Sequence, residues 1–181
     1  MMAKNVGKVF ELAIKESTPD YALLIRLNDQ PQSFAKTAKF SLKNPFDYIC
    51  FDTKTKTFYC WELKSTKYKS ISFEDITSDK EENKMIHRHQ VLGLKKYSAY
   101  SNVKSGFLFN FRHFEDDKDK YFETTYYQSI EDFLDMISKI NKKSFDEINL
   151  IQNNAIKISG FKKRTRWYWD LDSFLNSQGE N

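Results

Sequence analysis

Two carboxylates and a lysine are expected to meet where two short apolar segments of the sequence pair. The first segment runs from Asp47 to Phe51 and the second from Phe58 to Lys64. The polar residues between them predict an antiparallel hairpin in which Phe51 lies opposite Phe58. The same register places Asp47 opposite Glu62, and the alternation of side chains along a strand puts Lys64 on that face. The sequence therefore predicts an acid–acid–base cluster at one end of a hairpin.

Such a cluster suits the binding of a hard divalent cation. Cross-strand Cβ atoms lie about 5 Å apart, so Asp47 and Glu62 repel each other unless a cation lies between them or one is protonated. Mg²⁺ takes one or two carboxylates and keeps several waters. Lys64 would then hold the attacking water or a phosphate. A salt-bridge cluster on a solvated sheet face is the alternative, and spacing alone does not separate the two. The apolar residues around the charges favour the metal, because burying unpaired charges is costly.

The hairpin needs a sheet and covering helices to hold it, and the remaining pattern supplies both. An amphipathic stripe of Val6, Val9, Phe10 and Ala13 predicts the first helix. Gly and Pro positions, hydrophobic alternation and capping residues predict the other elements. In chain order these are a helix over 5–16, a buried strand over 21–27, a strand over 34–40, the hairpin, a helix over about 84–99, a central strand over 106–111, a strand over 121–127, a helix over about 129–140, a helix opened by a Ser144–Glu147 capping box, and a short strand over 155–159 that Gly160 breaks.

The amino-acid composition limits the classes of protein to which the chain can belong. The chain has 181 residues, of which 30% are charged and 40% hydrophobic, and these values predict one globular domain over 1–181 with frayed residues at 176–181. The net charge of +4 is compatible with a polyanion partner. No apolar run reaches the length that spans a bilayer, and the N-terminus lacks the pattern of a signal peptide. Cys50 and Cys60 would point to opposite faces, so a reducing, cytoplasmic setting is expected.

The motifs around the cluster resemble those of a nuclease family. Pro45-x-Asp47 followed by Glu62-Leu63-Lys64 looks like the PD-(D/E)xK signature. The order of the flanking motifs resembles the RecU family of Holliday junction resolvases, in a version compatible with a phage origin. Two departures are Pro45, where RecU proteins usually carry threonine, and a short segment in place of the projecting stalk, here 28–44. The flanking motifs are Gly7-Lys8-Val9-Phe10-Glu11, His89-Gln90 and Arg164-x-Arg166-Trp167-Tyr168-Trp169-Asp170-Leu171.

The resemblance implies a fold, a reaction and a set of site residues. The fold is α/β, with a restriction-endonuclease-like mixed sheet flanked by helices. The activity is that of a Mg²⁺-dependent endonuclease, with Mn²⁺ as a substitute, that cuts four-way DNA junctions as a homodimer. Asp47, Glu62 and the backbone carbonyl of Leu63 would bind the metal. Glu11 becomes a candidate outer ligand and Gln90 is expected to face the site, although by sequence alone both are ordinary helix residues.

Basic residues in three places are candidates for DNA contacts. A basic surface with interleaved aromatic residues suits backbone binding and base stacking, whereas solvated lysines, or an edge strand whose aromatic side chains pack on the core, explain the same pattern. Two rival functions stay open: a restriction or repair nuclease of the same fold, and a non-catalytic DNA-binding protein. The candidate contacts are Lys36, Lys39, Lys67, Lys69, Lys162, Lys163, Arg164 and Arg166.

Overall fold

A six-stranded mixed sheet forms the centre of the protein. The computed structural model describes residues 6–27, 44–114 and 121–179, and the expected strand at 34–40 and stalk at 28–44 lie almost wholly outside them. Only β3 and β5 pair in parallel, and the other neighbours are antiparallel. In spatial order the strands are β1 (Ala22–Arg26), β2 (Tyr48–Asp52), β3 (Thr57–Thr66), β5 (Val103–Phe114), β6 (Tyr121–Ser129) and β8 (Ile156–Ile158).

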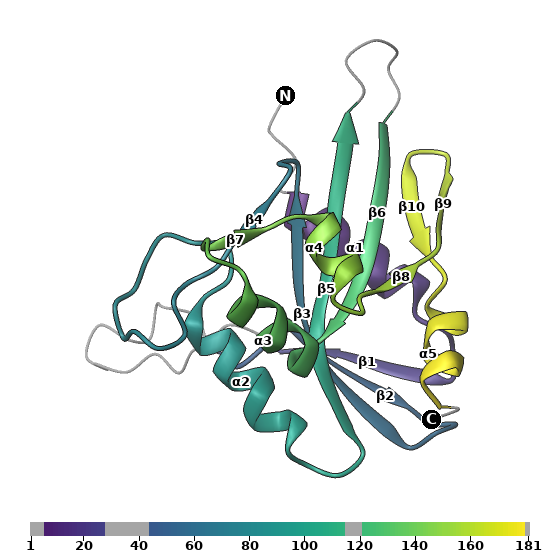
Figure 1. Ribbon diagram of the computed structural model, residues 1–181. Helices are drawn as coiled ribbons and strands as arrows, with labels where there is room; N and C mark the ends of the chain where they lie inside the picture. Colours follow the sequence, from purple (N-terminus) through teal and green to yellow (C-terminus); the bar gives the residue numbers. More distant parts are fainter. Residues whose placement is uncertain (1–5, 28–43, 115–120, 180–181) are drawn as a thin grey trace, which may run out of the picture.

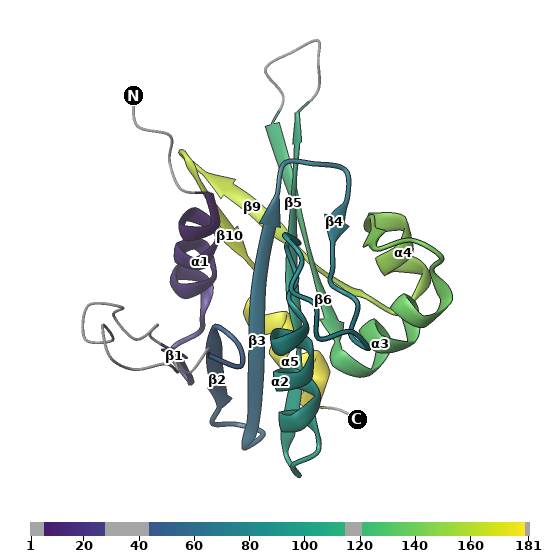
Figure 2. The same ribbon diagram turned by 90° about the vertical axis from the view of Figure 1, so that its left-hand side faces the viewer.

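Helices cover both faces of this sheet (Figures 1 and 2). We call them the α1 face and the α2 face. On the α1 face lie α1 (Val6–Ser17), α5 (Leu171–Gly179) and the hairpin of β9 (Gly160–Lys163) and β10 (Arg166–Trp169). The α2 face carries α2 (Arg88–Ser98), α3 (Ile130–Lys139), α4 (Glu147–Gln152) and the small β4–β7 pair (Ile71–Ser72 with Ser144–Phe145).

Alternation along the strands builds a separate core on each face. Trp61 and Leu108 are fully buried on the α1 face, where they pack with Phe174 of α5. Phe107 and Phe109 lie on either side of Leu108 along β5. Their side chains point to the opposite face and pack against Phe133 of α3. Because strand side chains alternate, one central strand supplies both cores. The expected α/β class with a mixed sheet and helices on both sides is therefore confirmed.

The expected hairpin register is confirmed as well. Phe51 lies opposite Phe58, and their rings stack with centroids 4.4 Å apart. Cys50 and Cys60 are free, buried and divided between the two cores, as the alternation predicted. Ser129 is the N-cap of α3. β5 is central to the sheet, again as expected.

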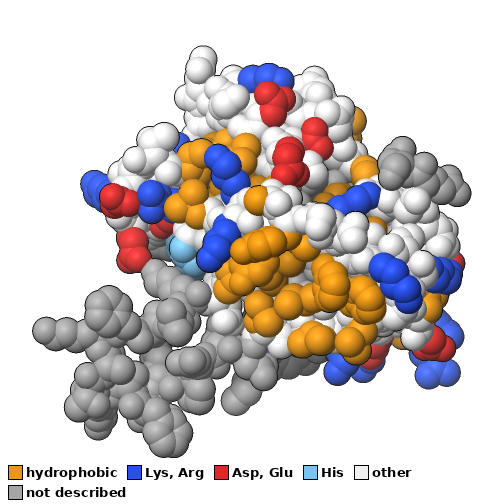
Figure 3. All heavy atoms as spheres, turned by 90° about the horizontal axis from the view of Figure 1, so that it is seen from below, with side chains coloured by type: hydrophobic (Ala, Val, Ile, Leu, Met, Phe, Trp, Pro, Cys, Tyr) orange, Lys and Arg blue, Asp and Glu red, His pale blue; other side chains and the backbone are white. Residues whose placement is uncertain are grey.

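Two expectations about burial near the N-terminus are wrong. The segment around β1 was expected to be a buried strand, but β1 is an edge strand, with Leu23 55% and Ile25 45% exposed. Hydrophobic side chains gather on the face of the molecule that lies at the bottom of Figure 1, as Figure 3 shows. On α1, Val9 was placed on the buried stripe but is 42% exposed, and Ile14 is buried instead. Both errors arise because local hydrophobicity does not show how far the neighbouring layer extends.

Three element boundaries differ from the expectations. α2 begins at Arg88 because Ile86 still bridges Phe73. The capping box of α4 uses Asp146 and Asn149, since Ser144 belongs to β7. Helix α5 runs to residue 179, so the tail from 176 is not frayed over its described part. The short strand β8 ends before Gly160, as expected, and Gly160 opens β9. No helix in the described part of the chain is long and apolar enough to cross a membrane.

Candidate carboxylate and lysine site

The predicted cluster lies where β2 ends and β3 continues alone. The Asp47 N–H donates to the Trp61 carbonyl oxygen at 3.1 Å, and the Leu63 N–H donates to Asp47 Oδ2 at 2.9 Å. These bonds extend the hairpin register by one residue, so Asp47 lies opposite Glu62. Lys64 Nζ is 2.9 Å from Glu62 Oε1. The three side chains that the sequence grouped are therefore together at one end of the hairpin.

Burial makes the two carboxylates costly to ionise together. Glu62 is 2% exposed, and burial raises its pKa to about 7, with Lys64 opposing and Asp47 adding to the shift. Burial also raises the pKa of Asp47, against the hydrogen bond from Leu63 and the charge of Lys64, while Glu11 adds to the rise. Carboxyl groups whose pKa values are raised by burial and by each other mark a candidate functional site. A solvated salt-bridge cluster would not show this burial.

Gln90 reaches the cluster from the first turn of α2. Its Nε2 donates to Glu62 Oε1 at 2.5 Å, and its Oε1 accepts from the His87 N–H at 2.9 Å. A Cβ on Gly93 would lie 2.5 Å from the Pro45 carbonyl oxygen, so only glycine lets α2 approach the chain this closely just before Asp47. The structure therefore brings Gln90 into direct contact with Glu62.

A second buried carboxylate, Glu74, fixes the start of α2. Its Oε2 accepts from the Arg88 N–H at 2.7 Å, and its Oε1 accepts from the Glu82 N–H at 3.0 Å and lies 2.9 Å from His87 Nδ1. Burial alone would raise the pKa of Glu74, but these donors outweigh it and lower the pKa to about 2. Glu74 thus anchors the helix turn that presents Gln90.

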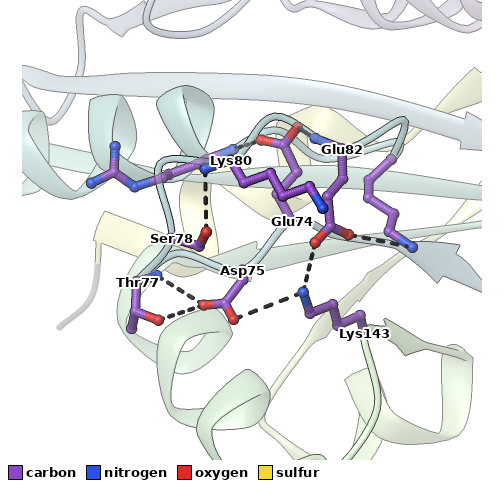
Figure 4. Close-up of polar contacts among 9 residues, drawn as sticks. Glu74, Asp75, Thr77, Ser78, Lys80, Glu82 and Lys143 are labelled. Carbon is purple, nitrogen blue, oxygen red and sulfur yellow. Dashed lines mark hydrogen bonds and ion pairs between the residues drawn. The ribbon is translucent and has the colours of Figure 1, made fainter.

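The loop that carries Glu74 is held by its own ion pairs (Figure 4). Lys143 lies between Glu82, at 2.7 Å, and Asp75, at 3.8 Å. Asp75 also accepts from the Thr77 hydroxyl and N–H at 2.6 and 2.9 Å. The hydrogen bonds from Thr77 lower the pKa of Asp75, and the bond from Lys143 lowers the pKa of Glu82. These ion pairs and hydrogen bonds hold together the loop that carries Glu74, and through Glu74 they support α2.

Glu11 lies close to the cluster but has its own partners. Glu11 Oε2 accepts from Arg26 Nε at 3.0 Å and from the Tyr48 hydroxyl at 3.2 Å. Its charge contributes to the raised pKa of Asp47, so the two carboxylates are within electrostatic reach. Glu11 is therefore neither a freely solvated helix residue nor, in this arrangement, a direct neighbour of Glu62.

The donor set fits a cation that keeps several of its waters. No three His, Cys, Asp or Glu side chains of the described residues are grouped to hold a metal. Asp47 and Glu62 match the one or two carboxylates that Mg²⁺ takes. The Leu63 N–H points toward Asp47, and because the N–H and C=O of one residue project from the same strand edge, the Leu63 carbonyl faces the side on which β2 has ended. A closed all-protein zinc site does not fit.

The expected DNA-contact residues are spread over several places. Lys36 and Lys39 lie outside the described residues, and Lys67 and Lys69 are exposed just past the end of β3. The four cations of the C-terminal group are exposed on the β9–β10 hairpin, and one of them, Arg166, forms an ion pair with Glu16. Trp169 of that hairpin belongs to the core, since it is 3% exposed and stacks on Trp167, whereas Phe161 is 59% exposed. The other three cations are Lys162, Lys163 and Arg164.

Two histidines, His87 and His89, stack on each other at the start of α2. His87 is the N-cap and precedes the helix, and its ring stacks on His89 with centroids 5.6 Å apart. Because α2 begins at Arg88, His87 lies just before the helix and its ring can face that of His89. His87 contacts Glu74, so its part here is to anchor α2.

Sequence reasoning missed the partners that hold these side chains. Arg26 was visible as the one charge in an apolar segment, and that interruption was a usable signal for a partner such as Glu11. Glu74 had no such signal, because its donors come from residues 8 to 14 positions away in an irregular loop. Tyr48 follows Asp47 directly, and alternation sends it to the α1 face, where it meets Glu11.

Comparison with known proteins gives one informative match. No protein-family model matches the chain. The chain is 31% identical over 185 residues to the SPbeta prophage-derived uncharacterized protein YotM of Bacillus subtilis strain 168. The alignment covers 95% of this chain and 86% of that protein. With this identity along nearly the whole length, the chain belongs to the family of the prophage protein YotM.

Proposed function

We propose that this protein is a Mg²⁺-dependent DNA endonuclease of the PD-(D/E)xK kind, and that its substrate is a four-way DNA junction, as in RecU-type Holliday junction resolvases. One observation carries the proposal. Glu62 is almost completely buried opposite Asp47, has a raised pKa, and is contacted by both Lys64 and Gln90. One lysine offsets only part of the charge of the two buried acids, so a divalent cation between them would stabilise the ionised pair.

Each residue of the cluster has a role in this reaction. Asp47 and Glu62 would hold Mg²⁺, or Mn²⁺ in its place, with the Leu63 carbonyl as a further ligand. When bound, the metal lowers the pKa of a water and offsets charge on the phosphate. Lys64 would orient the attacking water or stabilise negative charge that develops at phosphorus. Gln90 would hold the Glu62 carboxylate in place, and Glu11 would do the same for the surroundings of Asp47.

The substrate part of the proposal rests on the family resemblance and on charge. Exposed cations just after β3, Lys67 and Lys69, lie in the chain directly beyond the cluster, where they would contact phosphates. In the same proposal two copies form a homodimer, so that two sites cut two symmetric strands. The prophage origin of the relative YotM agrees with the proposed phage origin of this protein.

Two rivals predict different results in one experiment. A restriction or repair nuclease of this fold would cut linear duplex as well as junctions. A non-catalytic DNA-binding protein, which the exposed cations of the β9–β10 hairpin would suit, would bind DNA without cutting it.

The test is incubation of the protein with labelled mobile four-way junctions and matched linear duplexes, with Mg²⁺ or with EDTA. We expect symmetric nicks in the junction only, only with Mg²⁺, and only with Glu62 present. Glu131→Gln serves as the control, since it removes an exposed carboxylate of α3 that is not part of the cluster. Cutting that survives EDTA or Glu62→Gln would overturn the metal-site proposal, and equal cutting of duplex would overturn the junction specificity.

A further inference from the structure

The outer face of the β9–β10 hairpin carries two aromatic rings and two cations. In the register of the hairpin Phe161 lies opposite Tyr168, and Lys163 lies opposite Arg166. Because side chains alternate along a strand, these four residues share one face, and the other face carries Trp169, which is buried in the core. The hairpin therefore has an inner face that packs on the protein and an outer face turned to solvent.

The two rings of the outer face form a stacked pair that solvent can reach. Their centroids lie 5.7 Å apart, and their planes differ by 18°. Phe161 is 59% exposed although its side chain is large and apolar, whereas Tyr168 is half-buried. A flat aromatic group placed on the Phe161 ring would extend the stack and remove apolar surface from water, which is favourable.

A hollow of about 380 Å³ lies beside the two rings, where the hairpin joins α5. Phe161 and Tyr168 line it together with Asp170 and Asp172, the residues on either side of the first residue of α5. Ionised carboxylates only accept hydrogen bonds. This end of the hairpin therefore suits a group that combines a flat ring with N–H donors.

The opposite end of the hairpin is positively charged. Arg164 lies in the turn and Lys163 precedes it; both are exposed, and neither forms an ion pair with a carboxylate of a described residue. Arg166, by contrast, is paired with Glu16. From residue 148 to residue 169 the chain has five Lys or Arg residues and no Asp or Glu. The turn and α5 lie at opposite ends of the hairpin (Figure 1), so the rings lie between a cationic end and an acidic end.

We propose that this outer face binds unpaired nucleotides of single-stranded DNA. A base would stack on the Phe161 ring, and its N–H groups would donate to the carboxylates of the hollow. Lys163, two residues and about 7 Å along the strand from Phe161, would hold a backbone phosphate with Arg164. In a duplex the faces of the bases are covered by their neighbours, so duplex DNA offers no face to this ring.

This contact goes beyond the proposed cleavage reaction. It needs neither the metal nor the carboxylate cluster, so either proposal can fail without the other. It is measured with the full-length protein in EDTA, where a metal-dependent nuclease does not cut.

The first experiment compares two fluorescein-labelled probes by anisotropy. One is a thymidine 12-mer, which forms no duplex with itself, and the other is a 12-mer with the same sugar-phosphate backbone and no bases. We expect the thymidine 12-mer to bind about tenfold more tightly, a factor that the stacking of one base supplies. Equal binding of the two probes would overturn the proposal, because the bases would then contribute nothing.

Variants of Phe161 separate ring stacking from apolar contact. Phe161→Trp keeps a ring and should bind the thymidine 12-mer as the wild type does, whereas Phe161→Leu should bind it about tenfold more weakly. Tyr100→Leu is the matched control, since Tyr100 is 58% exposed just after the end of α2. Because Phe161 is more than half exposed, its variants should fold. Wild-type affinity of Phe161→Leu would overturn the proposal.

The salt dependence of binding tests the cations separately. Lys163→Gln should reduce the salt slope by about 0.7 units for both probes, the value expected for one phosphate of a single strand. Phe161→Leu should leave the slope unchanged. An unchanged slope in Lys163→Gln would overturn the assignment of the phosphate to this hairpin.

A photochemical crosslink locates the bound base. A 12-mer with one 5-iodouracil couples on irradiation to an aromatic ring that the base contacts, and mass spectrometry of the peptides identifies this ring. We expect coupling at Phe161 or Tyr168. Coupling only at Tyr68, which is exposed just past β3, would overturn the proposal and place the single strand beside the carboxylate cluster. Conversion of a dimer to a monomer by Phe161→Leu in sedimentation would also overturn it, since the ring would then belong to a protein interface.

Discussion

Two buried glutamates contact the first turn of α2, and their environments are opposite. Glu62 is 2% and Glu74 is 4% exposed. Glu62 accepts from Gln90 and pairs with Lys64, but it faces a second carboxylate, and its pKa is raised to about 7. Glu74 accepts from two backbone N–H groups and contacts His87, and its pKa is lowered to about 2. Burial raises the pKa of both carboxyl groups; it prevails at Glu62, whereas the donors around Glu74 outweigh it.

The contrast distinguishes a candidate functional carboxylate, Glu62, from a carboxylate that stabilises the fold, Glu74. A carboxylate with enough donors is stable as an anion and contributes to folding. A buried carboxylate held against another carboxylate weakens folding, and such an arrangement is expected where a cation or a reaction needs it. Chain distance does not distinguish the two, because Glu62 and Glu74 are only 12 residues apart and serve the same helix.

The largest effect should come from neutralising the pair. Glu62→Gln or Asp47→Asn should lower Mg²⁺-dependent junction cleavage by about 10³-fold or more, because a metal ligand is lost. Junction binding should persist, and the free energy of unfolding of the metal-free protein should rise, since the carboxylate repulsion is gone. Cleavage assays and denaturant unfolding measure the two effects. Near wild-type cutting by either variant would remove both residues from the metal site.

Lys64→Ala should have the next largest effect. If Lys64 positions water or stabilises charge during the reaction, the cleavage rate at saturating DNA should fall by about 10²-fold. Metal affinity, measured by titration of Mg²⁺ in the cleavage assay, should change little. A variant with normal turnover and weaker DNA binding would instead make Lys64 an ordinary phosphate contact.

Glu74→Gln should show the reverse pattern of Glu62→Gln. It removes a carboxylate that several donors surround, so the free energy of unfolding should fall by about 2 kcal/mol. Cleavage should remain metal-dependent. Denaturant unfolding of this variant beside Glu131→Gln tests the contrast, and a Glu74→Gln variant more stable than the wild type would contradict it.

The pH dependence sharpens the same contrast. The pKa of Glu74 is lowered from 4.5 to about 2 by folding. The stability that its ionised form contributes is therefore fully present above about pH 4.5 and is lost as the pH falls through about 2. Glu74→Gln should lose this part of the acid sensitivity, as thermal melting between these pH values would show. Equal acid sensitivity of the variant and the wild type would assign the loss to other groups.

The smallest expected effect is on the salt dependence of junction binding. It compares a cation that is paired with a carboxylate, Arg166, with one that is not, Arg164. Arg164 is exposed at the β9–β10 turn with a φ of 57°, a conformation that asparagine tolerates, whereas Arg166 is paired with Glu16. If the turn contacts DNA, Arg164→Asn should reduce the salt slope of junction binding by about one unit. Arg166→Gln should change it less. An unchanged slope for Arg164→Asn would place the DNA path elsewhere, along Lys67 and Lys69.

Local pattern was sufficient for the hairpin and for its three charged residues. The side-chain period of two and the even loop length set the register, so Asp47, Glu62 and Lys64 could be placed from sequence alone. The central β5 and the Ser129 cap of α3 were likewise predictable, because alternation and capping act over a few residues. Where a boundary depended on a distant partner, as at Ile86 before α2, the prediction failed.

The sequence by itself determined the α/β class, the hairpin register and the grouping of the acid pair with Lys64, because each depends on neighbours within one hairpin or one helix turn. Tertiary structure alone decided that Gln90 touches Glu62, that Glu74 anchors α2, and that Val9 lines a groove beside the β9–β10 hairpin. These features join segments that are far apart in the chain or in irregular loops, where burial and donor supply depend on how the layers pack. The same physics explains why two glutamates of one sequence, both with little exposure to solvent, have pKa values shifted in opposite directions.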